Sequence, residues 1–471
     1  MRFLNSQGQA IGSTELGRTV LAAAEPKLSS EIASVENWRK DYLKFFREVA
    51  KAELVSPRSA IEVATQGLKV FEESVFTDNN ENLLEVISKA WRNNKDQVSM
   101  VVIKGTGPAK QPDFFEAAGL VKQHLAEPMV AEKLGAFELS SLKSNLLIAL
   151  AGGAEYSPAR VWLDWGGTTA IVARPRPELW SELISRARNS SGTLHVPVLK
   201  SRAQGIDIQN LSDEELANVS GLDLVQDYEA IAGWLSMLAR TETGGLVLGC
   251  YAYAPGVKHI EVQAVQHCLG RVMSEALPKS RVTLNWLATP TDAYAVPIDV
   301  VNDINNRYHQ RTALIRVRDL IFGVRKHQFE LFETESGQRM AIMDATSALQ
   351  GPSYALAKRT QRWMAYQQLF AGRNVAYLVS PPAETRSVLN KRILRLTYAG
   401  APAFGLDPFA VDQAVSVATG LLVAELSAPR SQNALSGYLD LAVHGGLWRV
   451  IYSPKSAWRA ATILGAITLG L

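Results

Sequence analysis

From residue 98 to the end of the chain, short apolar runs alternate with helical patterns. The clearest unit begins at Leu146–Leu150, an unbroken apolar run that is followed by the turn Ala151-Gly152-Gly153 and then by a helical pattern. A further apolar run follows at Thr168–Ala173. Strand, glycine turn, helix and strand form the repeating unit of an α/β protein, and uninterrupted apolar strands indicate a parallel sheet covered on both faces. We therefore expect an α/β fold.

The length and internal order of the chain predict three parts. The 471 residues exceed one average domain. Residues 1–95 give helical patterns alone. The segment Gly245–Ala293 reads as strand, long helix, strand and proline-bearing loop, and Gln338–Arg386 repeats this order, which indicates an internal duplication. The alternative is chance similarity between two α/β units. We predict a helical region at 1–95, an α/β lobe at 96–300 and a second, partial lobe at 301–471.

Composition excludes several classes of protein. Lys and Arg number 49 against 46 Asp and Glu, so a general coat for nucleic acid or membranes is not expected. The two cysteines, Cys250 and Cys268, form neither a disulfide framework nor a zinc motif, which indicates a reducing compartment and no metal site. The apolar runs Ala414–Leu426 and Ala460–Leu471 are shorter than the roughly 20 residues that span a bilayer. We expect a cytoplasmic protein without a transmembrane segment, with membrane contact of the last run as a second choice.

A tyrosine and a lysine four residues apart carry the main chemical signal. Tyr354 and Lys358 lie in one predicted helix and share a face of it. The ammonium group would lower the pKa of the phenol, so that Tyr354 could donate a proton to a carbonyl that is being reduced. Thr346 and Ser347, which follow the preceding apolar run, are the hydroxyls that would hold the carbonyl. The alternative is a solvated lysine one turn from a half-buried tyrosine.

Together with the loop from Pro381 to Thr385, these pieces resemble the short-chain dehydrogenase/reductase family. The resemblance covers roughly residues 143–450, in one near-complete and one partial copy. This arrangement is similar to that of large ketoacyl reductases, in which a degenerate Rossmann-like lobe precedes a catalytic lobe. It implies two fused Rossmann-like lobes and an NADP cofactor. By this resemblance Gly152 and Gly153 stand at the cofactor turn, and Arg174 ends the second strand, where an arginine favours the 2′-phosphate of NADP.

The chain also departs from the pattern of this family. Tyr156 and Pro158 stand near the places of the last two glycines of the cofactor turn, where a side chain crowds the pyrophosphate and proline removes an N–H donor. In the first copy His259 and Gln263 replace the tyrosine and the lysine, so that copy is expected to be silent. The expected function is an NAD(P)H-dependent carbonyl reductase that acts, for example, on a ketoacyl thioester. The alternative is a non-catalytic scaffold or partner subunit of a biosynthetic complex.

A basic run between residues 307 and 326 suggests a partner. Its functional interpretation is a dock for an acyl carrier protein, or for the phosphates of a coenzyme A thioester or NADPH, and the alternative is a solvated helix face. The four residues expected to form the carrier dock are Arg307, Arg311, Arg316 and Arg318. Specific nucleic-acid binding is not expected. Family dimers join through the long helices beside the active site, so a homo-oligomer is compatible with the resemblance. Here we predict that 262–277 and 354–370 pack together.

Overall fold

The computed structural model describes residues 1–93, 96–113, 116–347, 350–427 and 438–470, and its centre is a seven-stranded sheet. The strands lie in the order β13-β9-β8-β5-β6-β7-β4, and neighbours are parallel except for the antiparallel pair β4–β7. Their bounds are β4 Val98–Lys104, β5 Asn145–Leu150, β6 Thr168–Val172, β7 Thr193–Leu199, β8 Gly245–Cys250, β9 Val282–Ala288 and β13 Asn374–Val379. The predicted α/β class is confirmed.

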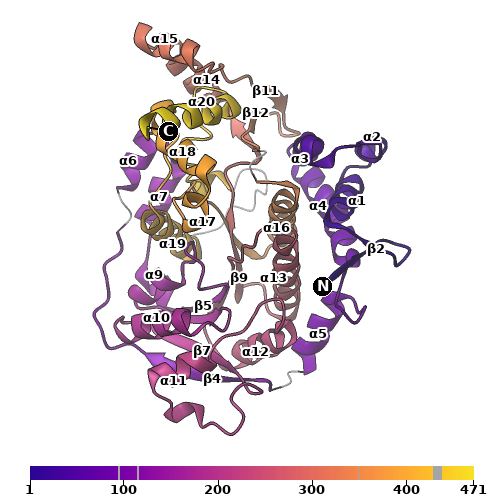
Figure 1. Ribbon diagram of the computed structural model, residues 1–471, viewed down its shortest axis with the longest axis vertical. Helices are drawn as coiled ribbons and strands as arrows, with labels where there is room; N and C mark the ends of the chain where they lie inside the picture. The colour runs from indigo at the N-terminus through magenta and orange to yellow at the C-terminus, as the bar shows by residue number, and fades with distance from the viewer. Residues whose placement is uncertain (94–95, 114–115, 348–349, 428–437, 471) are drawn as a thin grey trace.

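The apolar strands are buried on both faces, as the unbroken run in β5 predicts. Leu146, Ile148 and Leu150 belong to one hydrophobic core, whereas Leu147 and Ala149 belong to a second core on the opposite face. This division follows from the two-residue period of a strand, which sends successive side chains to opposite faces. Each face is then covered by helices (Figure 1). On the first face lie α12 Tyr228–Thr241, α13 Lys258–Ala276 and α16 Pro352–Phe370, and on the second lie α9 Ala159–Asp164, α10 Pro177–Arg188 and α19 Val411–Ser427.

The order of the parallel strands marks one edge of the sheet as the place for a ligand. Numbered along the chain from β5, the strands β5, β6, β7, β8, β9 and β13 stand in the order 3-2-1-4-5-6. This is the order found in dinucleotide-binding sheets, where ligands bind outside the carboxyl ends of the strands, at the point where the chain reverses direction across the sheet. Here that point lies between β5 and β8, which are neighbours in the sheet.

The two fused lobes of the sequence analysis are not confirmed. Strand β13, which was assigned to the second lobe, pairs with β9 of the first, so both predicted lobes contribute to one sheet. The supposed first strand of the duplication, β12 Arg339–Asp344, instead pairs antiparallel with β10 Ala293–Pro297 and β11 Glu330–Glu333 in a separate small sheet. A short apolar run looks the same in a central parallel sheet and in a small antiparallel sheet, so the sequence of the run does not identify the strand with which it pairs.

The small sheet belongs to a long excursion of the chain between β9 and α16. The excursion also holds two helices, α14 Ile298–His309 and α15 Ala313–Ile321. Thr312 begins the second helix, because its side chain accepts a hydrogen bond from the backbone N–H of Ile315. Figure 1 shows α15 projecting from one end of the molecule, beside α14.

The N-terminal residues form a helical layer on α13 and α16. Figure 1 shows this layer, from α1 to α5, along the side of these two helices. Gly67 of α4 lies against the ring of Trp363, and Glu72 of α4 is 2.6 Å from His267 of α13. Its elements are α1 Ser13–Ala24, α2 Ser29–Ser34, α3 Trp38–Glu53, α4 Pro57–Ser74 and α5 Leu83–Asn93, with the short strands β1 Arg2–Leu4, β2 Ala10–Ile11 and β3 Val75–Phe76.

Buried charges join the N-terminal layer to α16. Glu53 of α3 contacts Arg359 at 2.7 Å, and Asp292, which lies between β9 and β10, contacts the same arginine at 2.6 Å. Arg362 lies 3.4 Å from Glu53 and 3.5 Å from Asp292. Glu53, Arg359 and Arg362 are at most 1% exposed. Two carboxylates therefore neutralise two arginines inside the protein, and three separate parts of the chain supply them.

The predicted contact between the two long helices is confirmed. Gln361 of α16 donates a hydrogen bond to Gln263 of α13 at 2.8 Å, and Arg271 of α13 donates one to Gln367 of α16 at 3.1 Å. The helices are neighbours in one layer over one sheet.

The remaining helices complete the molecule. They are α6 Ala117–Lys122, α7 Met129–Gly135, α8 Leu139–Lys143, α11 Asp213–Val219, α17 Arg386–Leu389, α18 Arg392–Gly400 and α20 Pro454–Thr468, with 3-10 turns at Pro26–Leu28, Ile208–Asn210, Ala401–Phe404 and Leu439–Leu441. Within the described ranges, no helix has the length and apolarity that crossing a membrane requires.

Candidate functional site

The helix that carries Tyr354 and Lys358 begins at the carboxyl edge of the sheet. Gly351 precedes it with a φ of 80°, a left-handed conformation that favours glycine, and Pro352 takes the first helical position, where its missing N–H costs nothing. Both functional side chains are half-buried. The ammonium nitrogen of Lys358 lies 5.7 Å from the centre of the Tyr354 ring, so the expected tyrosine–lysine pair is formed.

Thr289, which the sequence analysis did not select, is the hydroxyl beside Tyr354. It directly follows β9, and its hydroxyl lies close enough to the phenol of Tyr354 to lower the pKa of that group. Its Oγ1 is also 2.6 Å from Oγ1 of Thr291 and accepts a hydrogen bond of 3.3 Å from the side chain of Gln350. The arrangement thus brings a threonine, a tyrosine and a lysine together at the ends of parallel strands.

Of the two residues predicted for this role, Thr346 is bound to another side chain. Thr346 ends the small antiparallel sheet, where its Oγ1 donates a hydrogen bond of 2.5 Å to Asp344. It therefore serves the turn after β12. Ser347 lies in the loop that follows, and its carbonyl oxygen accepts a hydrogen bond from the backbone of Gln350. Gln350 reaches Thr289 and Thr291 through its side chain, and it is this residue that ties the loop to the site.

Lys358 is held away from the phenol by the backbone. Its ammonium group donates hydrogen bonds to the carbonyl oxygen of Leu287 at 2.8 Å and to the side chain of Gln361 at 3.1 Å. Burial lowers the pKa of Lys358 to about 8, because a desolvated ammonium ion is less stable than a hydrated one. The lysine therefore titrates close to neutral pH.

The phenol of Tyr354 does not have the lowered pKa that the sequence analysis expected. Burial raises the pKa of Tyr354 to about 12, although the nearby Thr289 hydroxyl acts in the opposite direction. The contribution of Lys358 is small because its ammonium group is directed to the Leu287 carbonyl. At neutral pH Tyr354 is a protonated phenol, which is the form that donates a proton.

His259 of α13 forms another wall of the site. Its ring centre lies 5.1 Å from that of Tyr354 and 5.0 Å from that of Tyr253, and its Nδ1 contacts the Ala254 carbonyl oxygen at 3.1 Å. Burial lowers the pKa of His259 to about 3, with a further contribution from the charge of Lys358, so the ring is neutral. The residue assigned to a silent copy thus contacts the tyrosine of the other, because α13 and α16 are neighbours.

The glycine turn after β5 packs closely against its own surroundings. A Cβ atom at Gly152 would lie 2.8 Å from the side chain of Ile171, and one at Gly153 would lie 2.6 Å from that of Leu179. Both glycines are therefore required for packing against β6 and α10. Ala151, just before them, has a left-handed φ of 62°.

Tyr156 connects this turn to the loop after β13. Its hydroxyl donates a hydrogen bond of 3.1 Å to the carbonyl oxygen of Pro381, and it lies close enough to Tyr354 to interact electrostatically with it. The neighbouring Glu155 forms an ion pair with Arg386 and accepts a hydrogen bond of 3.0 Å from the backbone N–H of that residue. Two contacts thus close the gap between the glycine turn and the proline loop.

Arg174 lies where the sequence analysis placed it. It follows β6 by two residues and is exposed, at the same edge of the sheet as the glycine turn. Its carbonyl oxygen accepts a hydrogen bond of 3.2 Å from the indole of Trp180, which fixes the backbone there.

Most of the basic residues proposed as a carrier dock are already paired with acids. Arg307 contacts Asp303 at 2.8 Å, and both Arg311 and Arg318 contact Asp319. Arg316 donates a hydrogen bond to the carbonyl oxygen of His309. Two carboxylates, Asp303 and Asp319, thus neutralise part of the charge of these four arginines.

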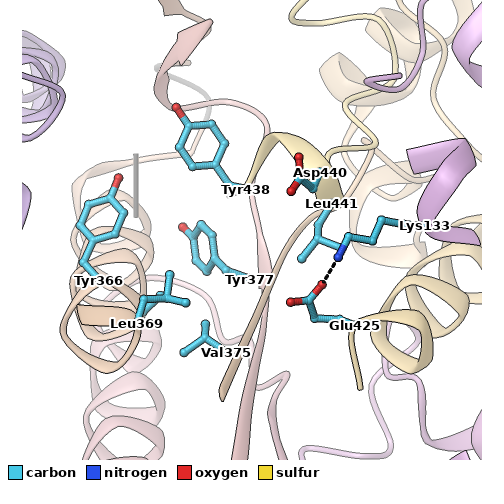
Figure 2. Close-up of a pocket in the computed structure, with 10 residues that line it drawn as sticks. Lys133, Tyr366, Leu369, Val375, Tyr377, Glu425, Tyr438, Asp440 and Leu441 are labelled. Carbon is cyan, nitrogen blue, oxygen red and sulfur yellow. Dashed lines mark hydrogen bonds and ion pairs between the residues drawn. The ribbon is translucent and has the colours of Figure 1, made fainter. Parts of the chain in front are cut away.

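A small pocket elsewhere is separate from the Tyr354 site (Figure 2). It contains about 30 Å³ of free space, which is about the volume of one water molecule, and Lys133 and Glu425 form an ion pair of 2.9 Å at its side. Tyrosines and aliphatic side chains from the end of α16, from β13 and from residues 438–441 form much of its lining. It is too small for an organic substrate.

The site has features that suit a polar ligand at one end and oppose a nucleotide at the other. Nε2 of His259 and Nε2 of Gln263 are buried and have no hydrogen-bond partner within the described part of the chain. Such atoms favour a polar ligand, because an unpaired buried donor or acceptor is unfavourable. Lys358 is half-buried and Arg174 is exposed. The Tyr156 side chain bridges the glycine turn and Pro381, which opposes a nucleotide at that end.

Comparison of the chain with known proteins found no matching family model, no matching curated protein and no matching solved structure.

Proposed function

We propose that this protein is a carbonyl reductase of the short-chain dehydrogenase/reductase type, dependent on NADP. The observation that carries the proposal is that Thr289 lies beside the phenol of Tyr354, with the Lys358 ammonium group 5.7 Å from the centre of the same ring. The three residues come from separate positions, one after β9 and two on α16, and meet at the edge where the sheet order predicts a ligand.

Each residue has a defined part in this proposal. The Thr289 hydroxyl donates a hydrogen bond that orients the substrate carbonyl, and the protonated Tyr354 donates the proton to the carbonyl oxygen. The proposal requires the Lys358 ammonium group, with a pKa of about 8, to turn from the Leu287 carbonyl towards the phenolate that is left behind and to stabilise it. The Gly152-Gly153 turn and Arg174 would hold the nucleotide, which when bound supplies the hydride. A ketoacyl thioester is the proposed substrate class.

A second function is favoured by one specific observation, the position of Tyr156. Its side chain occupies the space between the glycine turn and Pro381, and the Glu155–Arg386 ion pair lies beside it. If this closed arrangement is permanent, the protein is a non-catalytic relative that works as a scaffold or partner subunit, and its threonine, tyrosine and lysine are retained for structure.

Titration with NADPH and NADH separates the two functions. The native chain, Tyr156→Phe and Tyr156→Ala are compared by calorimetry at nucleotide concentrations up to about millimolar. For the reductase we expect NADPH to bind the native chain, and to bind Tyr156→Ala more tightly. Tyr156→Phe keeps the ring and is the matched control for its bulk.

The outcomes of the titration are distinct. Binding of NADPH but not NADH that is weakened by Arg174→Ala supports the reductase and the role of that arginine. No binding to any of the three proteins, including Tyr156→Ala, supports the scaffold. If nucleotide binds, turnover is then tested with a series of ketoacyl thioesters and simple ketones, and activity with the ketones alone would remove the thioester from the proposal.

A further inference from the structure

One end of the molecule exposes many large apolar side chains. In the described ranges eight of the sixteen exposed large hydrophobic residues lie on α15, on α18, or on α20 and the residue that follows it. The eight are Leu314, Val317, Leu320, Ile321, Ile393, Ile463, Ile467 and Leu469. Apolar residues gathered in this way on a protein surface mark an interaction site.

The clearest part of this surface is α15. Leu314, Val317 and Ile321 are spaced at three and four residues and therefore share one face, with Leu320 beside them. Leu314 and Leu320 are each 83% exposed, which is extreme for leucine. The opposite face contacts the body of the protein through the buried Asp319. The helix thus presents an apolar face outward from the end of the molecule (Figure 1).

The helix pair α18–α20 continues the surface. Gly465 of α20 lies against Leu396, and Gly400 lies against Ala461, so the two helices run antiparallel in close contact. This register places Ile393, at the start of α18, beside the end of α20, where Ile467 and Leu469 are exposed. Arg318 of α15 donates a hydrogen bond to the carbonyl oxygen of Ala403, in the turn that connects α18 to the following chain and contacts α20.

The charges of this surface are of one sign. Residues 385–406 contain four basic residues and no acidic one, and residues 441–471 contain three basic residues and no acidic one. On α15 the one carboxylate, Asp319, is buried. Among the described residues, five exposed cations here form no ion pair within 4 Å. They are Arg316, Lys391, Arg392, Arg395 and Arg459.

We infer that this surface, formed by α15, α18 and α20, binds the anionic headgroups and outer acyl region of a lipid bilayer. An anionic bilayer matches both properties at once, because its headgroups attract the arginines while the aliphatic side chains enter the boundary of the acyl chains. A second copy of the chain would bring the same basic surface against itself, where like charges repel. The inference is independent of the proposed reductase function.

Vesicle flotation with the full chain tests the inference. We expect binding to vesicles of phosphatidylcholine and phosphatidylglycerol at 7:3, about tenfold weaker binding to phosphatidylcholine alone, and loss of binding at high salt. The double variant Leu314→Asp/Leu320→Asp should lose binding, as should Arg392→Glu/Arg395→Glu. Ile206→Asp, at an exposed aliphatic residue outside the surface, is the matched control and should bind like the native chain.

Several results would overturn the inference. They are absence of native binding, equal binding to neutral and anionic vesicles, or undiminished binding of the leucine double variant. Sedimentation tests a further outcome. If the native chain is a dimer that does not bind vesicles, and the leucine double variant is a monomer, the surface is a contact between two copies of the chain. Circular dichroism confirms that the variants are folded, which is expected because both leucines are exposed.

Discussion

Thr289 shows how far the site could be predicted from single residues. The spacing of Tyr354 and Lys358 reveals a shared helix face, since these residues are local to each other. Thr289 is separated from them by the excursion that contains β10, α14, α15, β11 and β12. Thr346 and Ser347, the hydroxyls that follow the preceding apolar run, were selected in its place. A threonine at the end of a predicted strand, followed by Pro290, was the one available signal.

The assignment of Thr289 gives a direct prediction for activity. Thr289→Val keeps the branched shape of the side chain and removes the hydroxyl. This variant and Tyr354→Phe, each made singly, should lower kcat by about 10²–10⁴-fold. Thr346→Val and Ser347→Ala should leave kcat within about twofold, because the Thr346 hydroxyl is bound to Asp344. Steady-state kinetics with a substrate found in the thioester series measures this. If Thr346→Val lost activity while Thr289→Val kept it, Thr346 and not Thr289 would be the hydroxyl that orients the substrate carbonyl.

The buried Glu53 gives a prediction for stability. Glu53→Gln removes a charge that faces Arg359 and Arg362, and leaves Asp292 to neutralise both. We expect the free energy of unfolding to fall by about 3–5 kcal/mol, the usual cost of breaking a buried ion pair. Urea denaturation measures it. Glu62→Gln, on the exposed side of α4, is the matched control and should change stability by less than about 0.5 kcal/mol.

At the scale of elements, the sequence identifies strands better than their partners. The apolar runs of β5, β6, β8, β9 and β13 were recognised, because burial on both faces leaves an unbroken apolar signal. β12 was recognised too, but its antiparallel pairing with β10 was not, and the apparent duplication depended on it.

Two helical glycines should respond in opposite ways to alanine. At Gly67 of α4 a Cβ atom would lie 2.3 Å from the buried ring of Trp363, so Gly67→Ala should destabilise the protein by about 1–3 kcal/mol. At Gly270 of α13 the nearest atoms are 3.8 Å away, an ordinary contact, so Gly270→Ala should stabilise it by up to about 1 kcal/mol through helix propensity. Denaturant midpoints measure both. Equal effects would mean that α4 does not lie this closely on α16.

At the scale of the whole molecule, burial of histidines predicts sensitivity to acid. Burial lowers the pKa of His195 and His327 to about 4, and that of His259 to about 3. Their unfolded values are near 6.5, so the unfolded chain binds more protons than the folded one as the pH falls below 6.5. The stability is complete above pH 6.5 and decreases towards pH 4.

The expected slope follows from this proton difference. Each fully neutral histidine contributes about 1.4 kcal/mol per pH unit in the window, and three contribute roughly 4 kcal/mol per unit. Urea midpoints between pH 7.5 and 5 measure the slope. His327→Gln should reduce the slope by about 1.4 kcal/mol per pH unit. A flat profile from pH 7.5 to 5 would show that these rings are protonated in the folded protein.

The helical layer on α13 and α16 has a consequence for synthesis on the ribosome. Residues 1–93 are synthesised well before α16. Until α16 is made, their apolar faces lack the helix that covers them, and the Glu53 carboxylate lacks Arg359, which lies some 300 residues later in the chain. During that time the nascent chain exposes a surface suited to chaperones. Because β13 follows α16 in the chain, the β9 edge of the sheet stays unpaired until residues 374–379 have been synthesised. A slow codon stretch before residue 352 would prolong this vulnerable interval, whereas one after residue 380 would not.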